Sequence, residues 1–599
     1  MRLQLLFFVL LIVQSLKVIG QDIEKLINTK PTDLLKGKGL AIGGSVNANN
    51  RYYIPFNIPN RQISYQYLYS GRLIFDFLGK IKMPISFSFT NQGKNFAGVS
   101  LRRNLPAAQP FNRLSLKPTY KGSTLHLGTC TLLFSPFTLA GYRYQGVGYE
   151  YKSAKFPIYG SLMYGTLLKP IPIYADFPNN KPAYKRIGMG GKIGYKKEQD
   201  FIELILFNAA DKTNSLTYLL DDRNIYPESN LVLSANFQKV FLNKIFIKTE
   251  IASTQIFAEK NEFNSNLSFA KKLSRVIGLN KENKPKQAIK AGVDYKKDNS
   301  FIGFEYNRIA PNYKTFGGYF FINDLESLAL KSGMQVLDGK LSLNGDIGYQ
   351  RHNLDHTIPQ TLKQWVWAFD AAYAPNDKVN LSLNYSTFSS YSNFQNNFRY
   401  LTAIDPFQQA DTLNYRQINQ SLSTNYLFVL PISGKTKKMI TGNVVYQAGI
   451  DQQGQIPNIS KLTNVSINYG ISNETTKSSY SVGLNIIHNQ IASTRDFLYG
   501  PLMAISKPIL KNKAQLNTNI SYTFSNNQIA ESSKSIKKQV LLTSIAIQTT
   551  LWKKHKVSFT TMYLKTQNPL QKLMISEDFS ELTFNVGYNY HFQLVDLKF

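Results

Sequence analysis

The chain has 599 residues, a formal net charge of +32, 13% aromatic residues and 18% charged residues. It is longer than one ordinary globular core, and its charged share lies below the usual value of about a quarter, which is unusual for a soluble enzyme of this size. The single cysteine, Cys130, excludes an internal disulfide and a thiolate metal cluster. The basic charge would suit nucleic acid, acidic polymers or anionic lipid.

The first residues have the order of a secretory signal peptide. Arg2 supplies the charged start, residues 3–13 form an apolar run broken only by Gln4, and Gly20 precedes a plausible cleavage site. The run is too short to span a membrane as a helix, and no later segment is apolar for long enough to do so. Export makes nucleic acid the least suitable of the three partners.

The whole sequence predicts three regions. We expect residues 1–20 to be a signal peptide, residues 21–37 a short periplasmic segment, and residues 38–599 an outer-membrane β-barrel. Because only residues 21–37 precede the first expected strand, we expect no N-terminal plug domain of the kind that TonB-dependent transporters carry.

The evidence for a barrel is an alternation with period two. Apolar and polar residues alternate through residues 341–349, 379–385, 516–524 and 582–594. A helix would need apolar spacings of three and four, which these stretches lack. In a lipid-exposed barrel, every second side chain faces acyl chains and its neighbours face the lumen. A soluble β-sandwich also alternates, but the persistence of the pattern along an exported chain favours a closed barrel.

The connections alternate between short and long, as in outer-membrane barrels. Short turns are expected near residues 79–82, 121–123, 154–156, 196–200, 239–243, 296–300, 338–339, 375–377, 432–437, 471–477, 508–513 and 552–556. Longer outer loops are expected near residues 49–66, 92–110, 133–141, 169–184, 209–229, 255–286, 308–328, 350–362, 389–417, 449–462, 488–498, 525–536 and 566–578.

These connections predict the fold class. It is an all-β, transmembrane, antiparallel up-and-down β-barrel of about 26 strands, or 24 if one hairpin is miscounted. An even count places both termini in the periplasm of a Gram-negative cell. Lysines crowd the short turns, as in Lys196, Lys197, Lys296 and Lys297. They would either contact anionic lipid headgroups or simply solvate the turns.

The strand positions predicted to face the lumen carry both signs of charge. They are Arg72, Asp76, Lys117, Lys192, Lys248, Glu250, Lys290, Asp294, Glu305, Asp346 and Asp370. The lumen is therefore expected to be polar and mixed. The large positive total does not by itself predict an anion-selective pore.

Two features of the sequence resemble known outer-membrane barrels. The chain ends in Phe599 after an aromatic strand, which looks like the C-terminal signal that the barrel-assembly machinery recognises. Residues 125–128 with 134–141, residues 308–319, and residues 405–407 with 411–415 resemble a family of uncharacterised outer-membrane barrels from Bacteroidota. This resemblance implies the location and the fold, and it brings no catalytic residues.

Candidate sites for chemistry are few. His352 and His356 flank Asp355 in an expected outer loop, where a metal site is possible but a polar loop is the better interpretation. Residues 188–194 are rich in glycine, but they lie in a predicted strand with no helix after it, so a phosphate-binding loop is improbable. We expect no catalytic, cofactor or metal residue, and we expect that the protein is not an enzyme.

A barrel of this size must be filled, because barrels of about 22 strands are already plugged. Either the long loops 255–286 and 389–417 fold inward, or a protein partner or transported polymer fills or caps the lumen. The leading hypothesis is a gated or plugged conduit for a large solute or an exported protein. The alternative is a non-conducting surface scaffold that docks a secreted adhesin or assembly partner.

Overall fold

The computed structural model describes most of the chain that follows the expected N-terminal segments. The described residues are 40–77, 79–91, 113–172, 182–216, 225–258, 285–318, 323–357, 363–387, 390–393, 415–418, 420–430, 434–451, 458–491, 494–529, 535–552, 554–567 and 578–596. The predicted signal peptide and periplasmic segment lie outside these residues.

The described residues form strands almost throughout, with one 3-10 turn at Thr213–Ser215. The first strands are β1 (Leu40–Phe56), β2 (Tyr65–Phe77), β3 (Ile81–Thr90), β4 (Arg113–Leu116), β5 (Thr119–Tyr120), β6 (Ser123–Leu133), β7 (Ala140–Lys152), β8 (Ile158–Leu168), β9 (Lys185–Lys197) and β10 (Asp200–Lys212). The next are β11 (Glu228–Phe241), β12 (Ile245–Ala258), β13 (Lys286–Lys297), β14 (Ser300–Ile309), β15 (Leu325–Val336), β16 (Leu341–His352), β17 (Lys363–Asn376), β18 (Val379–Ser386), β19 (Ser390–Asn393) and β20 (Tyr415–Ile418). The last are β21 (Gln420–Val429), β22 (Thr436–Asp451), β23 (Asn458–Asn473), β24 (Ser478–Ile491), β25 (Thr494–Ile509), β26 (Ala514–Ile529), β27 (Ser535–Leu551), β28 (His555–Gln567) and β29 (Phe579–Asp596).

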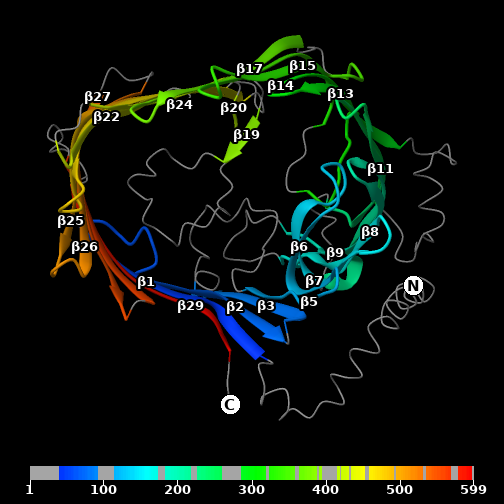
Figure 1. Cartoon of the computed structure of the whole chain (residues 1–599), viewed down its shortest axis with the longest axis horizontal. Helices are drawn as coiled ribbons and strands as arrows, with labels where there is room; N and C mark the ends of the chain where they lie inside the picture. Colours follow the sequence, from blue (N-terminus) through cyan, green and yellow to red (C-terminus); the bar gives the residue numbers. More distant parts are fainter. Residues whose placement is uncertain are drawn as a thin grey trace.

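The strands close into one ring (Figure 1). Each pairs antiparallel with the next along the chain, β4 and β5 share one position between β3 and β6, and β18 pairs with β21. The strand β29 pairs with β1 from Ser580 and Phe56 to Asp596 and Ala41, which closes the sheet. The result is a closed antiparallel barrel of 26 strands, so the predicted fold class and strand count are confirmed. The strands β19 and β20 form a separate two-stranded sheet.

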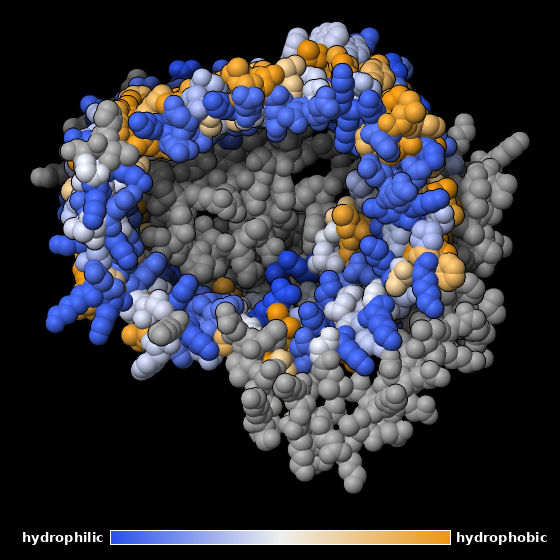
Figure 2. All heavy atoms as spheres, viewed as in Figure 1, coloured by the Kyte–Doolittle hydropathy of each residue, from blue (hydrophilic) through white to orange (hydrophobic). Residues whose placement is uncertain are grey.

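The predicted alternation is visible in the exposure of the side chains. In β29, Val586 and Tyr588 are 38% and 37% exposed, whereas Thr583, which has the opposite parity, is only 3% exposed. In β9 and β10, Ile193 and Leu204 are 60% and 57% exposed. Figure 2 shows hydrophilic residues along the rim of the ring and hydrophobic residues at its outer margin. A closed sheet satisfies its backbone hydrogen bonds internally, which allows these apolar residues to face lipid.

One expected loop is wrong. Residues 488–498 were expected to form a long outer loop, but β24 runs to Ile491 and β25 begins at Thr494. The polar residues near His488 belong to the end of β24, where pairing with β25 continues. A run of polar residues therefore does not show that the strand has ended.

Within the residue ranges described above, no helix is both long enough and apolar enough to cross a membrane.

Candidate functional site

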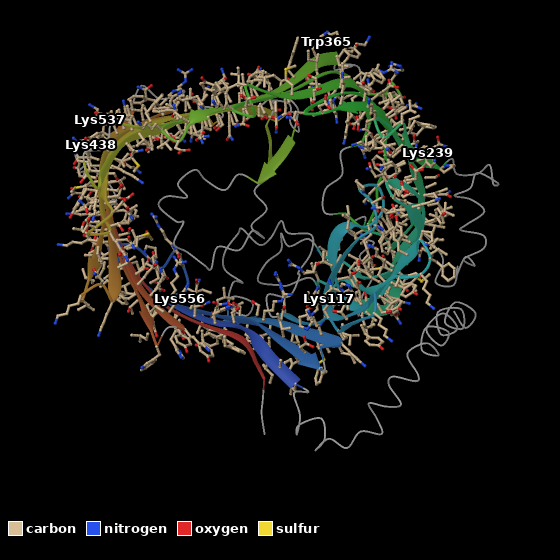
Figure 3. All side chains as sticks on the ribbon, viewed as in Figure 1. Lys117, Lys239, Trp365, Lys438, Lys537 and Lys556 are labelled. Atoms are coloured by element: carbon tan, nitrogen blue, oxygen red, sulfur yellow. The ribbon has the colours of Figure 1, made fainter. Side chains whose placement is uncertain are left out.

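The wall of the lumen is the candidate functional site, and its charges follow strand parity. In the strands, the predicted charges alternate with the exposed apolar residues and so lie on the opposite face of the sheet: Arg72, Asp76, Lys192, Lys248, Glu250, Lys290, Asp294, Glu305, Asp346 and Asp370. Lys117 lies in the break between β4 and β5, inside the ring in the view of Figure 3.

Several of these charges form ion pairs between neighbouring strands. Glu305 on β14 lies 3.3 Å from Lys290 on β13 and 3.0 Å from Lys331 on β15. Lys248 lies 2.9 Å from Asp294. Because Glu305 bridges two lysines, it is the centre of a cluster of ion pairs on the wall.

A second group of polar contacts lies on β8 to β11. Lys192 is 3.2 Å from Glu203, which also accepts hydrogen bonds from Tyr159 at 2.7 Å and from Asn236 at 2.9 Å. Glu203 and Lys331 were not predicted, although the same parity would have found both. Within the described part of the chain, no ion pair within 4 Å is formed by Arg72, Asp76, Lys117, Asp346 or Asp370.

The strands β21 to β28 form a different, neutral wall. Their charged residues lie near the strand ends, and their middle sections carry amides and hydroxyls. Asn425, Asn443, Ser466 and Asn485 lie in direct register across β21 to β24. A hollow of about 530 Å³ opens here, lined by side chains that include Asn464 and Asn519. We call this surface the neutral wall.

Two connections meet inside the barrel, and neither was predicted to do so. We call residues 134–139, between β6 and β7, and residues 310–317, between β14 and β15, the lumenal inset. They lie in the expected outer loops 133–141 and 308–328, but they pack on the inner face of the wall instead of extending away from it. Both lie in segments on which the family resemblance rests.

The two segments of the inset are joined by hydrogen bonds. The Tyr313 hydroxyl donates to the Phe137 carbonyl at 2.8 Å, and the Thr315 hydroxyl donates to the Thr138 carbonyl at 2.7 Å. The Ala140 amide donates to the Gly317 carbonyl at 2.8 Å. Burial raises the pKa of Tyr313, so its hydroxyl stays protonated and can donate.

Asn230 on β11 holds the inset to the wall. Its side-chain nitrogen donates to Thr254 Oγ1 at 2.8 Å and lies 3.3 Å from the carbonyls of Gln255 and Lys314. Its oxygen accepts from the Phe316 amide at 3.1 Å. Asn230 is fully buried. One side chain therefore satisfies the buried Phe316 amide, and it supports the Lys314 carbonyl, which also accepts from the Thr254 hydroxyl at 2.9 Å.

Apolar packing adds to these hydrogen bonds. Phe134, Leu139 and Phe316 belong to one buried cluster with inward-facing residues of the wall, which include Ile205 and Phe207. Burial of each large apolar side chain stabilises the inset by roughly 1.5–3 kcal/mol. The inset is therefore a packed part of the fold.

Arg186 on β9 contacts the inset and the wall. Its guanidinium carbon lies 3.5 Å from the centre of the Phe316 ring, a cation–π geometry. Its Nε and Nη2 donate to the two carboxylate oxygens of Asp211 at 2.7 and 2.9 Å. This bidentate pair fixes the orientation of the guanidinium over the ring.

The glycine-rich stretch 188–194 has a packing role in a strand. It lies within β9. A Cβ at Gly190 would come within 3.0 Å of the Phe134 ring and 2.8 Å of the Leu206 carbonyl. The missing side chain leaves the space that the inset occupies.

The histidine pair shows no metal-binding geometry. His352 ends β16, and Asp355 accepts a hydrogen bond from the Thr357 hydroxyl at 2.9 Å. Among the residues that the structure describes, no three histidine, cysteine or acidic side chains are grouped so that they could hold a metal ion.

We compared the chain with known proteins. No protein family and no curated protein matches it. Among solved structures it is similar to the FrpB iron transporter from Neisseria meningitidis (F3-3 variant), with 9% identity, a TM-score of 0.36, and 92% of this chain and 81% of that chain covered. It is also similar to OccAB2 of Acinetobacter baumannii, with 9% identity, a TM-score of 0.26, and 61% and 93% covered. A third is the P pilus usher (PapC) translocation pore, with 8% identity, a TM-score of 0.26, and 92% and 100% covered. Such weak likenesses carry no argument about function, so we argue it from the residues of this chain.

Proposed function

We propose that this protein is an outer-membrane conduit of a Gram-negative bacterium that passes a large solute or an exported protein through a gated or plugged lumen. One observation carries the proposal: a closed ring of 26 strands has an apolar outer face and a polar inner face. A wall of this kind separates lipid from water and encloses an aqueous path. Both termini would lie in the periplasm, and the barrel-assembly machinery would insert the chain.

The arrangement of the lumen supports a plugged path. The inset packs through apolar side chains on the inner face of β6 to β14. The neutral wall, on β21 to β28, carries amides and hydroxyls. Amides and hydroxyls of the neutral wall offer hydrogen bonds without fixed charge. The remaining space would be closed by the loops 255–286 and 389–417, which lie largely outside the described residues, or by a protein partner.

Planar-bilayer recording of the purified full chain tests the proposal. We expect discrete conductance steps, and we expect larger steps when residues 255–286 and 389–417 are deleted. A folded barrel that conducts neither before nor after these deletions would overturn the proposal.

The packing of the inset favours the alternative of a non-conducting surface scaffold that docks a secreted adhesin or assembly partner. Detergent pull-down with mass spectrometry separates the two functions. One stoichiometric partner, together with no conductance after its removal, would favour the scaffold.

The charged part of the wall yields a prediction about ion selectivity. In a KCl gradient, Glu305→Gln should shift the reversal potential toward the equilibrium potential of chloride. The reason is that Lys290 and Lys331 then lose the carboxylate between them. The matched control is Asp298→Asn, which removes a carboxylate from the short turn between β13, which carries Lys290, and β14, which carries Glu305. Equal shifts in the two variants would show that Glu305 does not face the ion path.

A further inference from the structure

The outer face of the barrel carries a row of basic residues at one height. Arg308 on β14 is in direct register with Glu326 on β15, Glu326 with Arg351 on β16, and Arg351 with Lys363 on β17. All four lie at the strand ends that lead into the long connections. We call Arg308, Arg351 and Lys363 the basic row.

Strand parity places this row on the outside. Arg308 has the parity of Ile302 and Phe304, which are 50% and 51% exposed. Lys363 has the parity of Trp365, which is 63% exposed and lies on the outer side of the ring in Figure 3. The three basic side chains are themselves exposed.

Two apolar rows lie next to the basic row, toward the middle of the strands. The nearer is Tyr306, Leu328, Tyr349 and Trp365, and the next is Phe304, Leu330, Ile347 and Trp367. Tyr349 and Trp365 pack edge to face with their ring centres 5.6 Å apart. From the middle of the strands toward their ends, aromatic side chains come first and cations follow. This order is expected where the acyl chains of a membrane give way to the headgroups.

Within the described residues, the basic row is only partly neutralised, by Glu326. Glu326 accepts from Arg351 and from the Tyr306 hydroxyl, the latter at 2.8 Å. Neither Arg308 nor Lys363 forms an ion pair within 4 Å in the described part of the chain. Arg351 and Lys363 are nevertheless directly opposite each other, and like charges in this position destabilise a sheet. An anion between them would remove that cost.

We propose that the basic row binds the phosphate of a lipid whose acyl chains lie on the two apolar rows. Arginine donates to phosphate oxygens in a bidentate geometry, and lysine adds a point charge beside it. Trp365, Trp367 and the aliphatic residues of the two rows on β15 and β16 supply the apolar contact below the headgroup. The site lies on the lipid face, so it does not depend on whether the lumen conducts.

The test uses the full chain in detergent and native mass spectrometry with three probes. They are dioleoyl phosphatidic acid, dioleoylglycerol, which has the same acyl chains without phosphate, and inorganic phosphate. We expect retention of phosphatidic acid, and weak binding of the other two. In R308Q/R351Q/K363Q the affinity for phosphatidic acid should fall by about tenfold to a hundredfold.

The matched control is K461Q/K537Q/K565Q. These lysines are also exposed, near the same ends of their strands and of outward parity, but they are not neighbours in register. The affinity of this variant for phosphatidic acid should stay within about twofold of that of the unmodified chain. Each variant is first shown to be folded by its heat-modifiable migration on a gel, and R351Q alone gives an intermediate loss if the triple variant does not fold.

Three results would overturn the proposal. They are an equal loss of affinity in the two triple variants, equally tight retention of dioleoylglycerol, and inorganic phosphate that binds as tightly as the lipid. Absence of conductance in the bilayer experiment would leave this lipid site unaffected.

Discussion

Replacing Asn230 with alanine is expected to release the lumenal inset and expose Cys130 to solvent. The change leaves the Phe316 amide without its side-chain partner, at about 1–3 kcal/mol for a buried group, and removes one of the two side-chain contacts of the Lys314 carbonyl. Cys130 is the only cysteine of the chain, is 3% exposed, and belongs to the apolar cluster that the inset covers. It is therefore a native reporter of the inset.

The measurement is the rate at which Cys130 reacts with a water-soluble maleimide in the folded barrel. In Asn230→Ala we expect the rate to rise by about a hundredfold, because a few kcal/mol shifts the opening equilibrium by that factor. Asn236→Ala is the matched control, since Asn236 lies on the same strand and face but bonds Glu203 and not the inset. If Asn236→Ala raises the rate as much as Asn230→Ala does, Asn230 does not hold the inset specifically.

The second large effect concerns two adjacent residues in the middle of β24. Leu484 has the parity of the lipid face and is 44% exposed, whereas Asn485 belongs to the neutral wall. Leu484→Arg should lower the free energy of unfolding by about 2–4 kcal/mol, the cost of arginine near the bilayer midplane. Asn485→Arg should lower it much less, because the side chain at this position faces the polar lumen.

Guanidinium unfolding of the chain refolded into lipid vesicles measures both variants. The comparison is sharp because the two positions are adjacent in β24 and lie on opposite faces of the sheet. Similar losses of stability at the two positions, or a larger loss for Asn485→Arg, would contradict the assignment of the faces.

The sequence predicts the wall well because each strand carries its own information. Alternation in a stretch such as residues 582–594 depends only on neighbours along the chain, and the short turns were found near their observed positions. The error at residues 488–498 arose because polar residues continue past the apolar part of β24. Pairing with the next strand, which a single stretch does not reveal, decides where the strand ends.

The inset could not be predicted in the same way. Tyr313 bonds Phe137 although 176 residues separate them, and nothing in either segment alone specifies the other. Their composition gave a hint, since Phe134, Phe137 and Phe316 are unusual in a solvated outer loop. Asn230 gave none, because an asparagine of inward parity is ordinary in a polar lumen.

One measurement tests the central claim, that alternate side chains of this chain meet lipid and water. Single cysteines are placed at residues 481, 482, 484, 485 and 486 in a Cys130→Ser background, labelled with an environment-sensitive fluorophore and reconstituted into vesicles. Position 483 is omitted because a Cβ at Gly483 would come within 2.5 Å of the Ile467 carbonyl. We expect brominated lipid to quench the label at positions 482, 484 and 486, and aqueous iodide to quench it at positions 481 and 485. Uniform quenching along the segment, or none by brominated lipid, would contradict the account.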